Sequence, residues 1–309
     1  MRTIILIFSF LLPLAGKTQT LQKHQFSYPK MGTQFRLTLY TIDTLQAKKL
    51  AEKSFRKVDA LNAIFSDYDP TSELSQLSKS AGTGQKVKVS KELWAILKMS
   101  KKFYGKSNGA FDITIGPLSK LWRSMIRQQK VFDEARIQQA KSKVGFEKIK
   151  FYPFSRKVQL TTKGMRLDLG GIAKGYTVDA IVAILKKHNI RQFMVDGGGD
   201  LYVGAAPPQQ SAWFVKTLAR KEGLKPTTIP LTHTAIASSG DTYRFIEWKG
   251  VRYSHIVDPR TGYGVTDRKI INVQAKNCAK ADAIASILNI LVGEEYTNFI
   301  KKEKGFHVF

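Results

Sequence analysis

The chain has 309 residues, of which 43% are hydrophobic and 11% aromatic, so intrinsic disorder is excluded and one large domain or two small ones can form a buried core. The net charge of +26 is spread along the chain as lysine pairs such as Lys48-Lys49 and Lys301-Lys302, with no nucleic-acid-binding signature beside them. We therefore expect no nucleic-acid partner. Anionic lipid and phosphate-bearing substrates remain as partners for a basic surface.

The N-terminus has the pattern of a secretory signal peptide. Met1-Arg2 precedes the apolar run Ile4–Leu14, and the small residues Ala15-Gly16 follow it. We expect residues 1–18 to be cleaved and residues 19–309 to form the mature domain. The mature protein is then exported, to the periplasm or to the outer face of the cytoplasmic membrane.

Two kinds of membrane attachment are weaker alternatives for this segment. A spanning helix needs about 20 apolar residues, and the run is shorter and contains Pro13. A lipoprotein needs a cysteine after the small residues, where this chain has Lys17. The single cysteine, Cys278, cannot form an internal disulfide, and we expect it to be a small apolar core residue.

Helical periodicity dominates the first half of the chain. Residues 33–41 alternate between polar and apolar as a strand does, and residues 45–64 carry apolar residues at near-helical spacing. In the polar turn that follows, Thr71 or Ser72 can cap a short helix that ends near Leu77. The further expected helices are Glu92–Tyr104, Leu118–Arg127 and Asp133–Val144.

Short strands separated by glycine turns dominate the chain after about residue 147. Two helices, Ile172–His188 and Ala281–Leu291, interrupt them. Mixed or antiparallel strands with segregated helices predict an α+β fold rather than a regular βαβ alternation. The expected strands are Ile149–Tyr152, Val158–Leu160, Phe193–Val195, Leu201–Val203, Trp213–Thr217, Ala235–Ala237 and Ile270–Ala275.

A strand that ends in two glycines and opens a helix lies at residues 166–179. Free backbone N–H groups and the positive end of the helix dipole meet at such a turn, where an anion can bind. Lys174, in the first helical turn, can reach a phosphate there. A tight turn that merely requires glycine explains the segment equally well.

Three consecutive glycines follow Asp196 and precede Asp200. Without side chains, these residues let the backbone approach a ligand closely, although a plain β-turn explains them nearly as well.

The segments 238–244 and 254–262 concentrate polar groups around one histidine. His255 lies three residues before Asp258, and Arg260 follows, so a base and a phosphate-pairing cation share one loop. A purely structural role for a lone histidine is the alternative.

Asp282 and Ser286 are four residues apart, so a helix presents both side chains on one face. Oxygen ligands suit a hard cation such as Mg²⁺, and Mn²⁺ can also occupy such a site. An acidic cap on a helix N-terminus is the alternative reading of this aspartate.

Taken together and in order, these segments resemble the ApbE family of FAD:protein FMN transferases across nearly the whole mature chain. The resemblance rests on the ordered set rather than on any single motif. The matching segments start at Met31-Gly-Thr, Phe65-Ser-Asp-Tyr-Asp-Pro, Gly109-Ala-Phe-Asp-Ile-Thr, Leu167-Asp-Leu-Gly-Gly-Ile-Ala-Lys, Gly197-Gly-Gly-Asp, Ser239-Gly-Asp, His255-Ile-Val-Asp-Pro-Arg and Ala281-Asp-Ala.

The resemblance implies a single T-fold-like α+β domain that binds FAD in a cleft, with Mg²⁺ at the pyrophosphate. The metal ligands that it implies are Asp282, Ser286 and the backbone oxygens of Gly171 and Ala285. Ser286 stands where many members have threonine and keeps the hydroxyl, whereas Asp196 adds a charge that the family pattern does not explain. The implied FAD contacts are Met31, Tyr68, Ala110, Phe111, Asp112, Asp168, Lys174 and Ile256.

The activity that the resemblance implies is Mg²⁺-dependent transfer of FMN from FAD to a threonine or serine hydroxyl of an acceptor protein, with release of AMP. His255 is the expected base, and Asp258 is the second candidate. The acceptor is expected to be exported or membrane-bound, and contact with the membrane surface is a further expectation. FAD hydrolysis to FMN and AMP, non-catalytic FAD binding and a basic nucleic-acid or lipid-binding module are the rival functions.

Overall fold

The computed structural model describes residues 20–129, 133–219, 225–240, 244–248 and 250–309. The expected signal peptide and Asp241 of the Ser239-Gly-Asp segment lie outside these ranges. Within them, no helix is both long and apolar enough to cross a bilayer.

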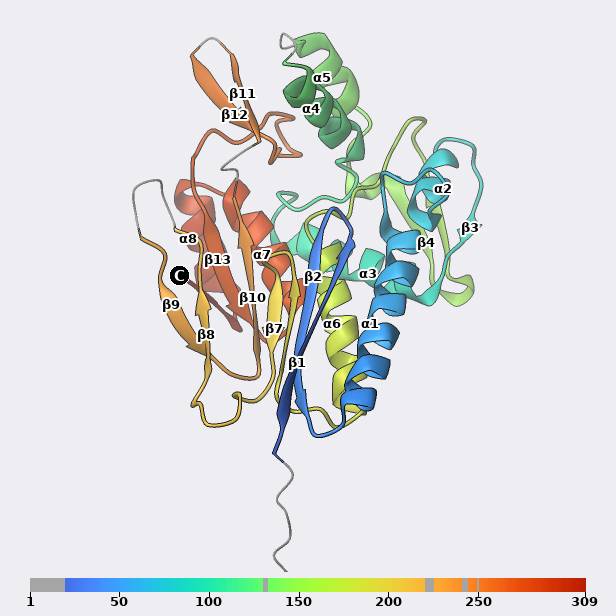
Figure 1. Ribbon diagram of the computed structural model, residues 1–309. Coiled ribbons are helices and arrows are strands. Elements are labelled where there is room, and N and C mark those ends of the chain that lie inside the picture. The colour runs from blue at the N-terminus through green and yellow to red at the C-terminus, as the bar shows by residue number, and fades with distance from the viewer. Residues whose placement is uncertain (1–19, 130–132, 220–224, 241–243, 249) are drawn as a thin grey trace, which may run out of the picture.

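A seven-stranded sheet forms the centre of the molecule (Figure 1). Every pairing in it is antiparallel. On the second strand, Phe35, Leu37 and Leu39 alternate with polar residues and are at most 1% exposed, so this strand buries one face. In spatial order the strands are β1 (Gln22–Lys30), β2 (Thr33–Thr41), β6 (Phe193–Gly197), β7 (Leu201–Val203), β10 (Thr234–Ser239), β13 (Ile271–Ala275) and β14 (Phe306–Val308).

Three helices pack on one face of this sheet, and a hairpin covers part of the other. The helices are α1 (Thr44–Phe65), α6 (Ala173–Lys187) and α7 (Cys278–Ile290), and the hairpin is formed by β8 (Trp213–Lys216) and β9 (Thr228–Leu231). Nearly every residue of α7 is buried, because it lies between the sheet and α6. Cys278 is fully buried in this layer, as expected for an apolar core residue.

The contact between α6 and α7 is close enough to require glycine. A Cβ atom on Gly175 would lie 2.5 Å from the carbonyl oxygen of Cys278. At this contact each helix caps the other: Asp179 accepts hydrogen bonds from the N–H groups of Cys278 (2.8 Å) and Ala279 (2.9 Å), and Asp282 accepts one from Gly175 N–H (3.1 Å). The carboxylates thereby satisfy N–H groups that a helix N-terminus leaves without internal partners.

The remaining elements form two outer regions. One packs a three-stranded sheet with α2 and α3 against the main core. The other has a small core of its own, in which Leu118, Trp122 and Ile137 contact Ile246 and Val257. The elements are α2 (Glu73–Lys79), β3 (Val87–Lys88), α3 (Lys91–Lys106), α4 (Gly116–Gln128), α5 (Glu134–Lys141), η1 (Phe146–Lys148), β4 (Ile149–Tyr152), η2 (Pro153–Ser155), β5 (Lys157–Leu160), β11 (Phe245–Trp248), β12 (Val251–Ser254) and α8 (Gly293–Lys302).

The predicted α+β class is confirmed, and each helix expected from periodicity is present within a few residues. The edge strand β1 was not predicted: none of its residues is fully buried, and only Phe26 and Tyr28 supply apolar surface on its inner side. The sequence analysis also missed the C-terminal α8 and β14, which are short, and the hairpin strands β9, β11 and β12.

A buried turn connects α3 to α4. Asp112 accepts hydrogen bonds from Thr114 N–H (2.8 Å) and Thr114 Oγ1 (2.7 Å), and Thr114 Oγ1 accepts one from Gly145 N–H (2.7 Å). Burial raises the pKa of Asp112 to about 6, against the hydrogen bonds from Thr114. The turn therefore contains a carboxylate whose charge is poorly solvated at neutral pH.

We expect Asp112→Asn to reduce the pH dependence of stability. The native pKa of Asp112 lies above its unfolded value, so the wild type loses stability as pH rises from about 4 to about 6, by up to about 3 kcal/mol. The amide does not ionise, so this loss should be absent from the variant. The measurement is urea unfolding of both proteins at pH 4.5, 6 and 7.5.

The readout is the slope with pH rather than the absolute stability, because an amide has one acceptor fewer than the carboxylate, which also accepts from Phe146 N–H. Parallel curves for the two proteins would contradict the assignment.

We expect Asp179→Ala to lower the free energy of unfolding by about 2–4 kcal/mol, because two buried N–H groups of α7 lose a charged acceptor. The matched control is Asp133→Ala, which removes an exposed cap from α5 and should cost about 1 kcal/mol. Equal losses in denaturant titrations would show that the α6–α7 contact does not depend on this carboxylate.

Candidate functional site

The N-terminus of α6 gathers charged groups from three elements. The helix begins at Ala173, one residue after Gly170-Gly171, and its N-cap residue Ile172 makes no side-chain hydrogen bond. Lys174 forms an ion pair with Asp200, which follows the glycine run, and Asp282 reaches the same helix end from α7. The sequence places Asp200 directly after the three glycines but does not indicate its partner.

Two buried carboxylates and one partly exposed ammonium group thus lie together. Burial raises the pKa of Asp282 to about 7, the charge of Asp200 adds to this, and Lys174 opposes it. Burial lowers the pKa of Lys174, but the charges of Asp200 and Asp282 outweigh it and raise that pKa. The cluster is one positive charge short of neutrality, which is an environment that favours a bound cation.

The expected metal-ligating residues lie together at this junction. A Cβ atom on Gly171 would lie 2.9 Å from Ser286 Oγ and 3.3 Å from the Phe111 ring, so only glycine fits there. Ala285 is fully buried next to Ser286 on α7.

Two oxygen atoms at this junction have no protein donor. Within the described ranges no hydrogen bond reaches Ser286 Oγ, whereas Ser100 on α3 donates back to Ile96 O. The same holds for Asp282 Oδ1, since the Gly175 N–H donates to Oδ2. The described residues contain no cluster of three histidine, cysteine or acidic side chains for a metal. The oxygen set here, with one carboxylate, one hydroxyl and backbone oxygens, fits a hard cation such as Mg²⁺.

A second group of charges lies just before the two glycines. Asp168 accepts hydrogen bonds from Gly170 N–H (2.8 Å), Ser119 Oγ (2.6 Å) and Arg123 Nη2 (2.9 Å). Arg123 also bonds Asp67 (2.6 Å), and its guanidinium lies 4.6 Å from the centroid of the Tyr68 ring.

Tyr68 as a residue is 74% exposed, although the guanidinium of Arg123 covers one side of its ring. It therefore presents a flat aromatic face that the protein core does not use. Arg123 carries no local sequence signal, because it lies in an ordinary helical pattern, and the sequence analysis missed it.

The turn between α3 and α4 separates this region from the histidine loop. Ala110 and Phe111 are buried, and Phe111 packs on Phe103 at 5.8 Å between ring centroids. Gly109 at its start lies against the Arg260 side chain, since a Cβ there would be 3.8 Å from Arg260 Cγ. Asp112 faces into the turn and holds Thr114, as described above, rather than extending outward.

The histidine loop contains the two expected bases in different surroundings. His255 is half-buried, and its Nδ1 lies 3.2 Å from the carbonyl oxygen of Arg244. Asp258 is buried and accepts hydrogen bonds from Arg260 Nε (3.0 Å) and Nη2 (2.8 Å), while Arg260 also pairs with Glu295. Ile256 between them packs on the main core.

Met31 and Gly32 form the two-residue turn between β1 and β2, with φ angles of 53° and 70°. Thr177 Oγ1 of α6 donates to Met31 Sδ at 3.6 Å, which brings this turn to the junction. The glycine run lies beside it, because a Cβ on Gly198 would overlap Thr33. Asp196 accepts a hydrogen bond from Gly199 N–H (2.8 Å), so its carboxylate shapes the glycine turn.

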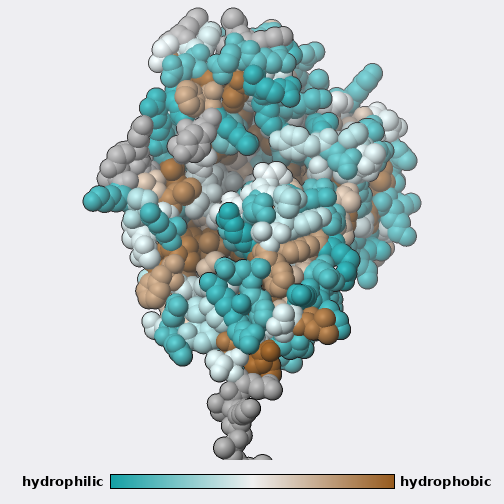
Figure 2. Space-filling model, in the orientation of Figure 1, coloured by the Kyte–Doolittle hydropathy of each residue, from teal (hydrophilic) through white to brown (hydrophobic). Residues whose placement is uncertain are grey.

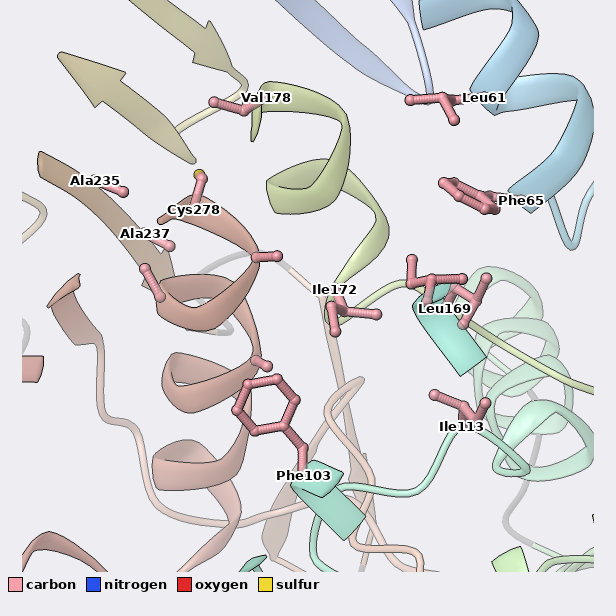
Figure 3. Packing of buried hydrophobic residues seen from close by; sticks show 14 of the residues in the cluster. Leu61, Phe65, Phe103, Ile113, Leu169, Ile172, Val178, Ala235, Ala237 and Cys278 are labelled. Atoms are coloured by element: carbon pink, nitrogen blue, oxygen red, sulfur yellow. The ribbon is translucent and has the colours of Figure 1, made fainter. Parts of the chain in front are cut away.

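The structure thus joins Gly171, Lys174, Asp282 and Ser286 with Phe111, and places Asp168 and Met31 at the margins of this cluster. Figure 3 shows apolar side chains of the main core, among which Ile172 and Leu169 lie near Phe65, Phe103 and Ile113. Figure 2 shows that the surface is hollowed between the upper region of α4 and α5 and the body of the molecule. His255 and Asp258 lie on a separate loop, in contact with this cluster through Arg260 and Gly109.

Comparison with known proteins gives a consistent result. The sequence matches the ApbE family over residues 31–309. A FAD:protein FMN transferase of Treponema pallidum is 30% identical over 292 residues, covering 89% of this chain and 80% of the relative. One of Chlamydia muridarum is 26% identical over 305 residues, covering 97% and 93%.

The solved structure of the flavin transferase ApbE from Vibrio cholerae matches with a TM-score of 0.81 at 26% identity, covering 94% of this chain and 97% of that one. The family match spans the main sheet from β2 onward, the α6–α7 junction and the histidine loop alike. This chain therefore belongs to the ApbE family.

Proposed function

We propose that this chain, a flavin transferase, uses Mg²⁺ to move FMN from FAD to a threonine or serine hydroxyl of an acceptor protein, with release of AMP. The names of its relatives and the family match support the flavin transfer itself. The oxygen cluster at the α6–α7 junction supports the dependence on Mg²⁺, with Mn²⁺ as a substitute.

The observation that carries this proposal is that Asp282 and Ser286 lie one turn apart on α7, with Ser286 next to Gly171. Asp282, Ser286 and the backbone oxygens of Gly171 and Ala285 would hold the ion. When bound, Mg²⁺ supplies charge neutralisation and Lewis acidity at a pyrophosphate. The chain's own cation, Lys174, and the N-terminal end of the α6 dipole add positive potential next to the same position.

The resemblance implies the FAD-binding roles, and the geometry of the surrounding residues supports them. Phosphoryl transfer depends mainly on positioning and on neutralising charge, so the junction would take the phosphates. The exposed Tyr68 ring would contact the flavin or adenine, with Arg123 beneath it. Met31, Ala110, Phe111 and Ile256 would form apolar walls, whereas Asp112 and Asp168 would hold the loops that carry them.

His255 is the residue that we propose takes the proton from the acceptor hydroxyl. Its side chain is half-buried on the loop whose Arg260 contacts Gly109, whereas the carboxylate of Asp258 is engaged by the guanidinium of Arg260. Both oxygens of Asp258 accept hydrogen bonds from the same guanidinium, so neither is free to approach a hydroxyl without breaking one of these bonds. Asp258 would then position the loop through Arg260.

We also propose that the mature protein is exported and acts on an exported or membrane-bound acceptor. The support is the charge and apolar pattern of residues 1–18.

We expect Asp282→Asn to reduce flavin transfer by at least about 100-fold, since even residues that only orient metal ligands contribute about 10–100-fold. The amide still accepts from Gly175 N–H, so the helix cap and the fold are retained. The assay incubates residues 19–309 with FAD, Mg²⁺ and an acceptor domain, and measures protein-bound flavin fluorescence and an increase in mass equal to FMN.

The matched control is Asp179→Asn, which makes the same change in a buried carboxylate on the other side of the same helix contact. This variant should keep most of the transfer activity. Equal losses of transfer activity in both variants would show that the loss comes from lower stability, and would contradict the assignment of Asp282 as a metal ligand. Free FMN and AMP without labelled acceptor would identify a hydrolase instead.

We expect His255→Gln to lower the transfer rate by about 100- to 10,000-fold, the range typical of a lost general base. FAD affinity, measured by equilibrium titration, should change little. Asp258→Asn should cost less in rate, because the amide oxygen can still accept from Arg260. A larger loss in Asp258→Asn than in His255→Gln would reverse the assignment of the base.

A further inference from the structure

We propose that the outer face of the three-stranded sheet β3–β5–β4 is a docking surface for an anionic lipid bilayer. The surface consists of Lys86, Lys88, Lys150 and Lys157 with Phe154 at its edge, and we call it the basic face. None of the site residues discussed above belongs to it.

The strand register places these lysines on one side of the sheet. Lys157 is paired with Lys88 on β3 and with Tyr152 on β4, so the three side chains form one row. Lys86 joins this row because its Nζ lies 4.5 Å from the centroid of the Tyr152 ring. The opposite side of the sheet, with Val87, Val158 and Phe151, packs on the main core.

No acidic residue neutralises the basic face. The chain contains no aspartate or glutamate between Glu73 and Glu92, or between Glu147 and Asp168. None of the four lysines forms a salt bridge with a residue that the structure describes, whereas Lys57 pairs with Glu92 and Lys106 with Glu303.

Lys88 and Lys157 are direct cross-strand partners, an arrangement that destabilises a sheet when both carry charge. Folding therefore gains nothing from this concentration of charge. An anionic partner would stabilise this concentration of positive charge.

Phe154 protrudes beside these charges at the apex of the β4–β5 turn. It is the most exposed of the large apolar side chains in the described part of the chain. Arg156, with φ of 49°, closes the turn, and its carbonyl oxygen accepts a hydrogen bond from Val89 N–H (3.0 Å), which ties the turn to the end of β3. The aromatic ring is thus presented by a fixed turn.

A bilayer surface matches this combination better than a nucleic acid does. Lysine ammonium groups bind anionic headgroups without defined geometry, and an aromatic ring at an apex can enter the interfacial layer. Base stacking requires an open ring on the strand surface, and the ring of Tyr152 is covered by Lys86. The docked lipid would therefore contact Phe154 first and the lysine row next.

The experiment is vesicle flotation with the chain lacking residues 1–18, so that the apolar run Ile4–Leu14 cannot itself insert into lipid. The vesicles contain 30% phosphatidylglycerol and 70% phosphatidylcholine, or phosphatidylcholine alone, at about 0.15 M salt, where the Debye length is about 8 Å. We expect binding to the anionic vesicles only, with release at about 0.5 M salt.

Two variants and two matched controls locate the contact. Lys88→Glu with Lys150→Glu should weaken binding by at least about 25-fold, about fivefold for each lysine lost. Lys48→Glu with Lys49→Glu makes the same charge change on the exposed surface of α1 and should retain most of the binding. Phe154→Ala should weaken binding, whereas Phe214→Ala, another exposed phenylalanine, should not.

Equal losses in the two lysine pairs would overturn the proposal, because binding would then follow net charge rather than the basic face. Equal binding to neutral vesicles, or no binding to anionic vesicles while a polyanion column retains the protein, would overturn it as well.

Discussion

The contact between α6 and α7 at the centre of this protein is stabilised by two carboxylates, one on each helix, that cap the N-terminus of the other helix. Asp179 caps the start of α7, Asp282 caps the start of α6, and Gly175 allows the two backbones to approach at the crossing. Helix ends that are buried need such partners, because their N–H groups cannot reach water. The main sheet packs on these two helices, so the position of each strand-end loop is set relative to this contact.

The same contact creates the electrostatics of the site. A carboxylate that caps a helix inside the core is poorly solvated, which disfavours its charged form. This desolvation is the main reason why the pKa of Asp282 is raised. Lys174 offsets the charge of one of the two nearby carboxylates, Asp200 and Asp282, so an oxygen-rich position with excess negative charge remains beside Ser286. Asp282 therefore serves the fold through one oxygen and leaves the other for a ligand.

The parts of the structure that depend on interactions between neighbouring residues could be predicted from the local sequence pattern. The amphipathic helices, the α+β class and the glycine turn before α6 could be derived from periodicity and turn chemistry. Asp179 and Arg123 could not, because their partners lie 99 residues or more and 45–56 residues away, respectively, and nothing in the neighbouring sequence marks them. The strand β1 was missed for a related reason, since an edge strand with exposed side chains is defined by its partner β2 rather than by its own pattern.

The main core and the small core hold different parts of the site. The histidine loop packs on the small core through Val257 and through the hydrogen bond from Trp122 Nε1 to Gly262 O (2.9 Å), and its apolar contacts with the main core are those of Ile256 and the nearby Val265. Lys174 and Asp282 lie on helices of the main core. Substitutions inside the small core can therefore shift His255 and Asp258 more than Asp282 and Ser286. The proposed base and the proposed cation site are for this reason separable, so a substitution can alter one with less effect on the other.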